Sequence, residues 1–60
     1  GKAIHIVLPV RKGEALTADK IAIKAPAEGI EPYRINDIIG RIFVCDCSTA
    51  DILTEEKLQW

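Results

Sequence analysis

The sequence has no long apolar run and no excess of charge of one sign. No segment approaches the roughly 20 apolar residues that a membrane-spanning helix needs, and no charged, then apolar, then small-residue leader opens the chain. Eight Lys and Arg residues are interspersed with nine Asp and Glu residues, for a formal net charge of −1. This pattern creates no field that would hold a phosphate backbone or an anionic membrane. We therefore expect no nucleic-acid partner, no membrane partner and, if the parent protein also lacks a leader, a cytoplasmic location.

Residues that carry out catalysis or bind metal ions are scarce. The single histidine, His5, alternates with isoleucines on a predicted strand, which favours a solvent-facing or rim position over a catalytic one. Cys45 and Cys47 are the only cysteines; two residues apart on extended backbone, they are expected to be reduced, buried thiols rather than a disulfide or zinc ligands. The four glycines are scattered and form no phosphate-binding loop. The sequence therefore predicts no catalytic residue, no cofactor site and no metal site in these 60 residues.

Although it is short, the chain has enough apolar side chains to fold. Hydrophobic residues make up 48% of the sequence, a fraction typical of globular domains and too high for a disordered segment. A domain of 60 residues buries a smaller share of its surface than a longer one does. We expect a single domain, 1–60, that does not enclose an active site by itself.

The chain also contains an internal repeat. Residues 7–21 resemble residues 44–58, and Thr17 and Thr54 mark equivalent positions 37 residues apart (54 − 17). A repeat of this period usually means that one supersecondary unit is used twice. Two copies are too few for a solenoid, so the repeat predicts two halves, related by a pseudo-twofold axis, that bury each other's apolar faces. The segment 24–30 then crosses between the halves.

The spacing of apolar and turn residues predicts a mainly β fold with short helical turns. Apolar residues with a period of two indicate strands at 2–10, 21–23 and 41–47. Thr17 and Thr54 are expected to cap single helical turns by accepting from free backbone N–H groups. A helix is expected to begin at Glu31-Pro32 and to end at Gly40.

Two further clusters have both a structural and a functional interpretation. Tyr33 and Arg34 follow the crossover, and an exposed aromatic ring beside a guanidinium suits an interface hot spot. Packing of Tyr33 against the loop, with its hydroxyl in water, is favoured over that hypothesis. Glu55 and Glu56 stand where a helix dipole stabilises negative charge, which favours a capping role over acid–base catalysis.

The order and spacing of several motifs resemble a known family. The sequence is similar to the SAF, or antifreeze-like, domain that ends bacterial sialic acid synthases and their relatives. The motifs that carry the resemblance are Val10-Arg11-Lys12-Gly13-Glu14-Ala15-Leu16-Thr17, Lys24, Pro26, Gly29-Ile30, Pro32, Ile38-Ile39-Gly40-Arg41, and Leu53-Thr54 with Leu58. The resemblance covers nearly the whole chain and implies a β-clip fold with a pseudo-twofold internal repeat, as the repeat itself suggests.

The resemblance also implies a parent enzyme. Residues 1–60 would be the C-terminal domain of a TIM-barrel synthase of the N-acetylneuraminate or spore coat polysaccharide type. Its barrel would bind a divalent metal, Mn or Mg, and condense phosphoenolpyruvate with N-acetylmannosamine or a similar hexose. The domain would cross to the other protomer of a swapped homodimer and cap its barrel over the sugar substrate. The isolated domain would have no activity of its own.

The resemblance places the capping contacts in and after the crossover. The residues so implied are Lys24, Ala25, Pro26, Glu28, Gly29 and Arg34. Members of the family usually read Lys-Arg-Pro-Gly-x-Gly-Ile here, and the arginine reaches the acetamido sugar. In this chain Ala25 takes that place and has no donor. Either the substrate lacks the group that the arginine recognises or another residue supplies the contact.

The family resemblance leaves two other functions open. SAF-type domains also occur as non-enzymatic binding modules in pilus and flagellar assembly, where an export signal on the full-length gene is expected. Similar domains bind ice in fish, which requires a flat surface of short, mostly uncharged side chains. The matching segment contains long charged residues, which argue against ice binding: Arg11, Lys12, Glu14, Asp19 and Lys20.

Overall fold

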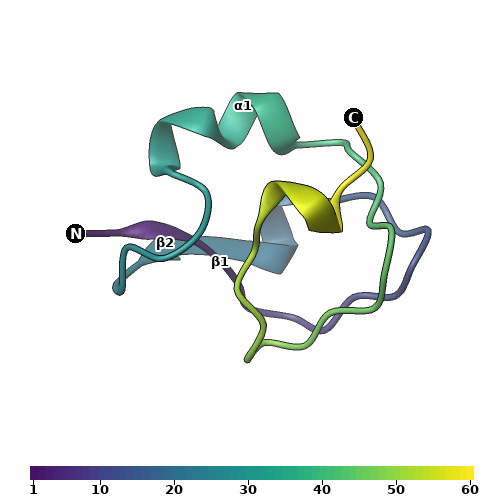
Figure 1. Ribbon diagram of the computed structural model, residues 1–60, viewed down its shortest axis with the longest axis horizontal. Coiled ribbons are helices and arrows are strands. Elements are labelled where there is room, and N and C mark those ends of the chain that lie inside the picture. The colour runs from purple at the N-terminus through teal and green to yellow at the C-terminus, as the bar shows by residue number, and fades with distance from the viewer.

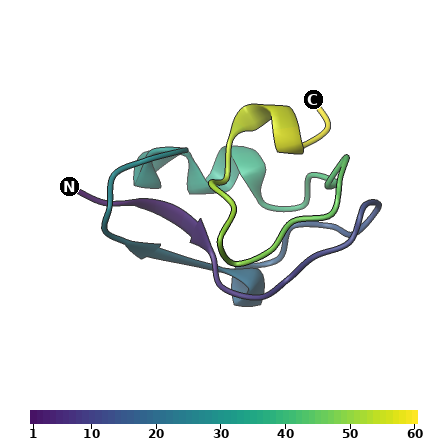
Figure 2. The same cartoon turned by 60° about the horizontal axis from the view of Figure 1, so that its bottom comes forward.

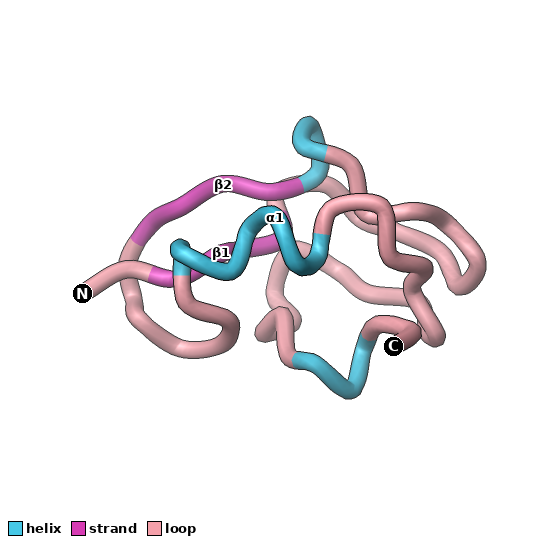
Figure 3. The backbone as a smooth tube through the Cα atoms, turned by 90° about the horizontal axis from the view of Figure 1, so that it is seen from above, coloured by secondary structure: helices cyan, strands magenta, loops and turns pink.

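The computed structural model describes residues 1–60, and most of the backbone lies in loops and turns (Figure 3). The regular elements, in chain order, are β1 (Ala3–Ile6), the 3₁₀ turn η1 (Ala18–Lys20), β2 (Ile21–Lys24), η2 (Pro32–Arg34), α1 (Ile35–Ile38) and η3 (Glu55–Lys57) (Figure 1). None of the helices has the length and apolarity needed to cross a lipid bilayer.

The two strands form a single antiparallel sheet. The register runs from Ala3 opposite Lys24 to Ile6 opposite Ile21. β-branched residues fill much of both strands, as expected for a pleated, half-buried surface. The strand predicted at 2–10 is shorter than expected, because regular pairing ends at Ile6. Leu8, which a period of two would place on the same face as Ile4 and Ile6, is 46% exposed.

The predicted pseudo-twofold axis passes between Val10 and Cys47. These residues occupy equivalent positions of the repeat, and each donates its N–H to the other's carbonyl oxygen, at 2.9 and 3.0 Å. A reciprocal bond between equivalent residues is the contact that a twofold axis generates. The segments that follow β1 and α1 accordingly run side by side in two views (Figures 1 and 2).

The pairing inside each half is repeated as well. Ile6 lies opposite Ile21, and Phe43 lies opposite Leu58 at the equivalent positions. The N–H of Val7 donates to Lys20 at 2.8 Å, and its counterpart at 44 donates to position 57 at 2.9 Å. The two halves therefore share a backbone hydrogen-bond pattern and not only a sequence pattern.

The core lies between the two halves and is entirely apolar. Eleven buried residues form one cluster, which consists of Ile4, Ile6, Val10, Leu16, Ile21, Ile30, Ile38, Phe43, Cys47, Leu53 and Leu58. Eight of them are four equivalent pairs of the repeat, such as Leu16 with Leu53. Each full burial of such a side chain contributes about 1.5–3 kcal/mol relative to exposure, so each half depends on the other for its stability.

The strand predicted at 41–47 is not a regular strand. Phe43 and Cys47 point inward and the residues between them are more exposed, so the alternation is present. However, the hydrogen-bond partners of this segment come from three separate places, and it forms isolated bridges at Ala15–Ile42, Phe43–Leu58 and Val10–Cys47. No single neighbouring strand continues the ladder. The period-two pattern therefore predicted a regular strand that does not form.

The helix after the crossover begins and ends as predicted. Pro32 stands at the first turn of η2, which continues into α1. Gly40 follows the helix end with φ of 89°, a left-handed conformation that glycine adopts without strain.

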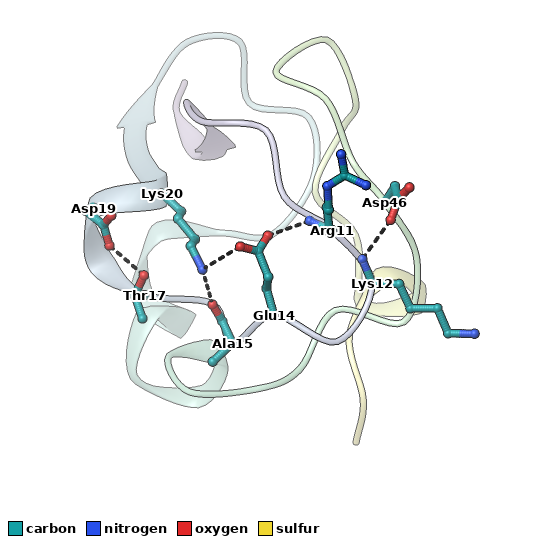
Figure 4. A network of polar contacts seen from close by, with 8 residues as sticks. All are labelled: Arg11, Lys12, Glu14, Ala15, Thr17, Asp19, Lys20 and Asp46. Carbon is teal, nitrogen blue, oxygen red and sulfur yellow. Dashed lines mark hydrogen bonds and ion pairs between the residues drawn. The ribbon is translucent and has the colours of Figure 1, made fainter.

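The two threonine turns lie where they were predicted but do not cap a backbone N–H. Neither Thr17 nor Thr54 makes a side-chain cap bond. Instead, the Thr17 hydroxyl donates to the Asp19 carboxylate at 2.5 Å (Figure 4). This bond is the first cause of a lowered pKa of Asp19, and a bond from Thr54 is the first cause of a lowered pKa of Glu56. The repeat therefore extends to the side-chain chemistry of its turns.

Candidate functional site

The crossover loop 24–30 is exposed along its tip and held at its base. Its first five residues are exposed, Gly29 is half-buried and Ile30 belongs to the core. The peptide bond between Ala25 and Pro26 is cis. His5 on β1 donates from Nε2 to the carbonyl oxygen of Pro26 at 2.7 Å. The histidine thus lies at the rim, as expected, and braces the loop.

The C-terminal end of the loop is hydrogen-bonded to both halves of the molecule. Ile30 accepts from the N–H of Ile4 at 2.9 Å, and its own N–H donates to Leu53 at 3.2 Å. Gly29 has φ of 104°, and a Cβ added there would lie 2.5 Å from the carbonyl oxygen of Leu53. Only glycine lets the loop approach the second half this closely.

Arg34 is held by residues that follow the loop rather than by the loop tip. Its guanidinium lies 3.4 Å from the carboxylates of Asp37 and Glu55, and its Cζ lies 5.4 Å from the ring centroid of Trp60. The bond to Glu55 is the first cause of a raised pKa of Arg34. The cation is thus already paired within the domain.

The structure brings together only two of the six predicted capping residues. Gly29 and Arg34 line one hollow of about 210 Å³, whose other lining residues are Ile30, Glu31, Thr54, Glu55 and Glu56. The remaining four, Lys24, Ala25, Pro26 and Glu28, lie outside that lining on the exposed part of the loop.

Tyr33 does not pack against the loop, contrary to the favoured interpretation. Its exposed fraction is 81%, the largest of any large hydrophobic side chain in the molecule. The packing interpretation is therefore wrong, and an interface role for this ring stays a prediction. Short turns such as η2 point successive side chains in different directions, and the sequence does not specify which one faces the core.

A second hollow, which the sequence did not indicate, is formed around Arg41 and Trp60. Its volume is about 580 Å³, and it is lined by Asp37, Ile39, Gly40, Arg41, Ile42, Gln59 and Trp60. The one available signal was the spacing of Asp37 and Arg41, which lie four residues apart across the end of a predicted helix. The ring of Trp60 comes from the other end of the repeat, and no local pattern indicates that it would meet Arg41.

The two thiols lie on one side of their segment. Cys45 and Cys47 are free, and their Sγ atoms lie 3.8 Å apart. Burial, with Cys45 nearby, raises the pKa of Cys47 to about 11, so this thiol is protonated at neutral pH. No three His, Cys, Asp or Glu side chains gather closely enough to hold a metal ion.

A known family resembles this chain in sequence, and a solved structure resembles it in fold. A sequence model of the SAF domain matches residues 1–59. The fold is similar to the solution structure of an antifreeze protein-like domain in the human N-acetylneuraminic acid phosphate synthase gene, with a TM-score of 0.89 and 20% sequence identity over 97% of this chain and 75% of that chain. No curated protein matches this sequence. At this identity the likeness concerns the fold, and it confirms the mainly β architecture predicted from the sequence.

Proposed function

Because this chain belongs to the SAF domain family, we propose that it caps the sugar site of a synthase that condenses phosphoenolpyruvate with a hexose similar to N-acetylmannosamine. The support is the family match together with the fold likeness to a domain from an N-acetylneuraminic acid phosphate synthase gene. In this proposal the domain covers a TIM barrel of the other protomer in a swapped homodimer. The parent enzyme works in the cytoplasm, where it meets phosphoenolpyruvate.

The braced crossover loop is the observation that carries the capping role. Its tip, 24–28, is exposed, while His5 holds Pro26 and Leu53 holds the end of the loop. A lid of this kind excludes water and positions a substrate without performing the bond chemistry. Because the loop is ordered before it meets the sugar, little conformational entropy is lost on closing.

The side chains on the loop tip define what the lid contributes. Lys24 supplies an ammonium that donates to sugar oxygens, and Glu28 supplies a carboxylate that accepts from sugar hydroxyls. Ala25 offers no donor, so the lid lacks the planar fork that an arginine would bring. Neither charged group is paired within the domain, which leaves both free for a substrate.

The domain takes no part in metal chemistry in this proposal. Its acidic and sulfur ligands do not gather into a group of three, so the divalent ion, Mn or Mg, would be held by the barrel. There it would polarise the reacting oxygen atoms. The residues of this chain bind and orient the sugar and exclude water.

A binding role without enzymatic activity is the second candidate. The exposed Tyr33 favours it, because an aromatic ring that is 81% exposed suits a partner surface. Ice binding is disfavoured, because the turn from Arg11 to Lys20 presents a network of charged and hydrogen-bonded side chains in place of a flat apolar face (Figure 4).

The test uses the full reading frame that contains this chain. A barrel-sized region upstream of Gly1 is expected, and the purified protein should consume phosphoenolpyruvate with N-acetylmannosamine and Mn²⁺. A Lys24→Ala, Glu28→Ala double variant should lower kcat/KM for the sugar about tenfold or more, the scale of one charged hydrogen bond. Lys12→Ala, on the opposite turn, is the matched control.

Two outcomes would overturn the proposal. Absence of a barrel region points to the binding module. An unchanged kcat/KM in the double variant of an active synthase means that the loop does not face the sugar.

A further inference from the structure

Arg41 is a rigidly held cation on the side of the molecule that bears Trp60. Its Nε donates to the carbonyl oxygen of Asp37 at 2.6 Å, and its Nη1 donates to the carbonyl oxygen of Gln59 at 3.3 Å. Its Cζ lies 3.8 Å from the centroid of the Trp60 ring. Two backbone acceptors and one aromatic face therefore fix the guanidinium in one orientation.

This cation has no carboxylate partner within the chain. The three ion pairs of the molecule involve only Lys20 and Arg34 as cations. Asp37 presents its backbone oxygen to Arg41 but its carboxylate to Arg34. A guanidinium has five N–H donors. Two are used here, so the Nη2 pair and one Nη1 proton stay free.

The surroundings of Arg41 combine charge with exposed apolar area. The hollow of about 580 Å³ that it lines also contains Ile39 and Trp60, which are 40% and 54% exposed. Small ligands usually bind in enclosed pockets that bury most of their surface. An open hollow lined by Trp, Arg and an aliphatic residue has instead the composition of a protein interface hot spot.

We propose that Arg41 and Trp60 form a docking site for a partner polypeptide that presents an Asp or Glu carboxylate between apolar side chains. The carboxylate accepts two N–H bonds from the free Nη atoms, and the flanking apolar groups cover Trp60 and Ile39. A bidentate pair of this kind is stronger and more directional than a single charged bond. Because the guanidinium is already stacked and bonded, docking orders few additional rotamers.

This site lies outside the capping loop, although Arg34, one of the predicted capping residues, contacts its Asp37 and Trp60. Its hollow shares no lining residue with the loop 24–30 or with the hollow beneath Arg34. The docking proposal can therefore fail while the capping proposal holds, and the reverse is also true.

The test is an NMR titration of the ¹⁵N-labelled chain with two capped peptides, acetyl-Leu-Leu-Glu-Leu-Leu-amide and its Gln counterpart. Addition of the Glu peptide should shift the Gly40 amide, the Arg41 Nε–H and the Trp60 Nε1–H, with a Kd of about 1 mM or below. The Gln peptide should bind at least about fivefold more weakly, because the charged pair is lost.

Variants of Arg41 distinguish the planar, two-donor geometry of the guanidinium from its positive charge. Arg41→Gln should abolish the shifts. Arg41→Lys should lose most of the affinity, because an ammonium has neither the planar fork nor the stacking face. Arg11→Gln, an exposed arginine on a distant turn, should bind as the unchanged chain does. Dispersed spectra of each variant will show that it is folded.

Three results would overturn the docking site. The first is the absence of shifts at these groups at millimolar peptide. The second is equal affinity for the Glu and Gln peptides or unchanged binding by Arg41→Gln. The third is binding of acetate alone at the same groups with the same affinity, which would identify a small-carboxylate site instead.

Discussion

The two halves of the molecule share one backbone pattern but use different side chains to brace it. In the first half, the ammonium of Lys20 donates to the carbonyl oxygen of Ala15 at 2.7 Å and lies 3.9 Å from the Glu14 carboxylate (Figure 4). Lys57, at the equivalent position of the second half, makes no such bond. There the indole of Trp60 donates to the carbonyl oxygen of Glu55 at 2.9 Å.

The features that occur in both halves differ in location from the features that occur only once. Of the repeated features, the core pairs and the Val10–Cys47 bond lie in the core, and the two turns, which have no buried residue, lie at the surface. The features that occur once include the crossover loop, Arg34 and the Arg41–Trp60 stack. Symmetry thus maintains the core, and each candidate site also depends on side chains that are not repeated in the other half.

The largest expected effect tests the symmetric core. Phe43→Ala should destabilise the fold by about 3–5 kcal/mol, and Ile6→Ala, at the equivalent position, by about 2–5 kcal/mol. Both side chains are almost fully buried, but the phenylalanine leaves the larger cavity. Denaturant unfolding measures the two free energies. Leu8→Ala, on an exposed side chain, is the control and should cost much less; a cost as large as that of Phe43→Ala would mean that the core is not where the structure has it.

The next largest effect compares two glycines with the same left-handed backbone. Gly29→Val should lower the free energy of unfolding more than Gly13→Val, by about 1–3 kcal/mol. Both have positive φ, but a Cβ at Gly29 collides with Leu53, whereas nothing lies within 4 Å of one at Gly13. At about 4–8 °C per kcal/mol, thermal melts resolve the difference. Equal melting temperatures would contradict it.

A third change restores a donor to the asymmetric loop. In the full-length parent, Ala25→Arg should raise kcat/KM for N-acetylmannosamine about tenfold or more, the scale of one charged hydrogen bond worth roughly 1.5–3 kcal/mol. Arg34 cannot supply this contact without leaving Glu55 and Asp37. Steady-state kinetics of the two proteins decide the matter, with Ala27→Arg on the same loop as the control. An unchanged or lower kcat/KM would mean that Ala25 does not face the sugar.

The smallest expected effect concerns the paired turns and acts through pH. The pKa values of Asp19 and Glu56 are lowered in the folded chain, so each contributes stability that is present above its unfolded pKa and is lost as the pH falls through its folded pKa. Thr17→Val should return the pKa of Asp19 toward 3.8, and Thr54→Val should do the same for Glu56 toward 4.5. Carboxyl NMR titrations measure both; a shift in only one turn would show that the repeat does not extend to this chemistry.

The sequence predicted what depends on local pattern and on the repeat. Pro32, Gly40 and the segment 21–24 behave as their residue types require, and the period of 37 led directly to the paired halves. The irregular ladder at 41–47 was not predictable, because its partners are distant in the chain. The threonine turns were placed correctly, but the hydroxyl was assigned the wrong role: Thr17 donates to the nearby Asp19 carboxylate and does not accept from a backbone N–H.

The candidate site was predicted less well than the fold. The family resemblance placed the capping residues on one loop, but pairing of Arg34 with Glu55 depends on a turn that follows it by about twenty positions. The Arg41–Trp60 stack likewise joins residues that lie far apart in the sequence. Such contacts are set by tertiary packing, and a single sequence carries no local record of them.

The reciprocal bond between Val10 and Cys47 makes the two halves one cooperative unit. Because both residues belong to the apolar cluster, we expect their amides to open to solvent only when the halves separate and expose that cluster. Hydrogen exchange at these two amides therefore proceeds only through global unfolding, whereas amides on the exposed loop exchange through local opening. A destabilising substitution in either half accordingly lowers the free energy of unfolding of the whole domain. A partner that binds either half raises it.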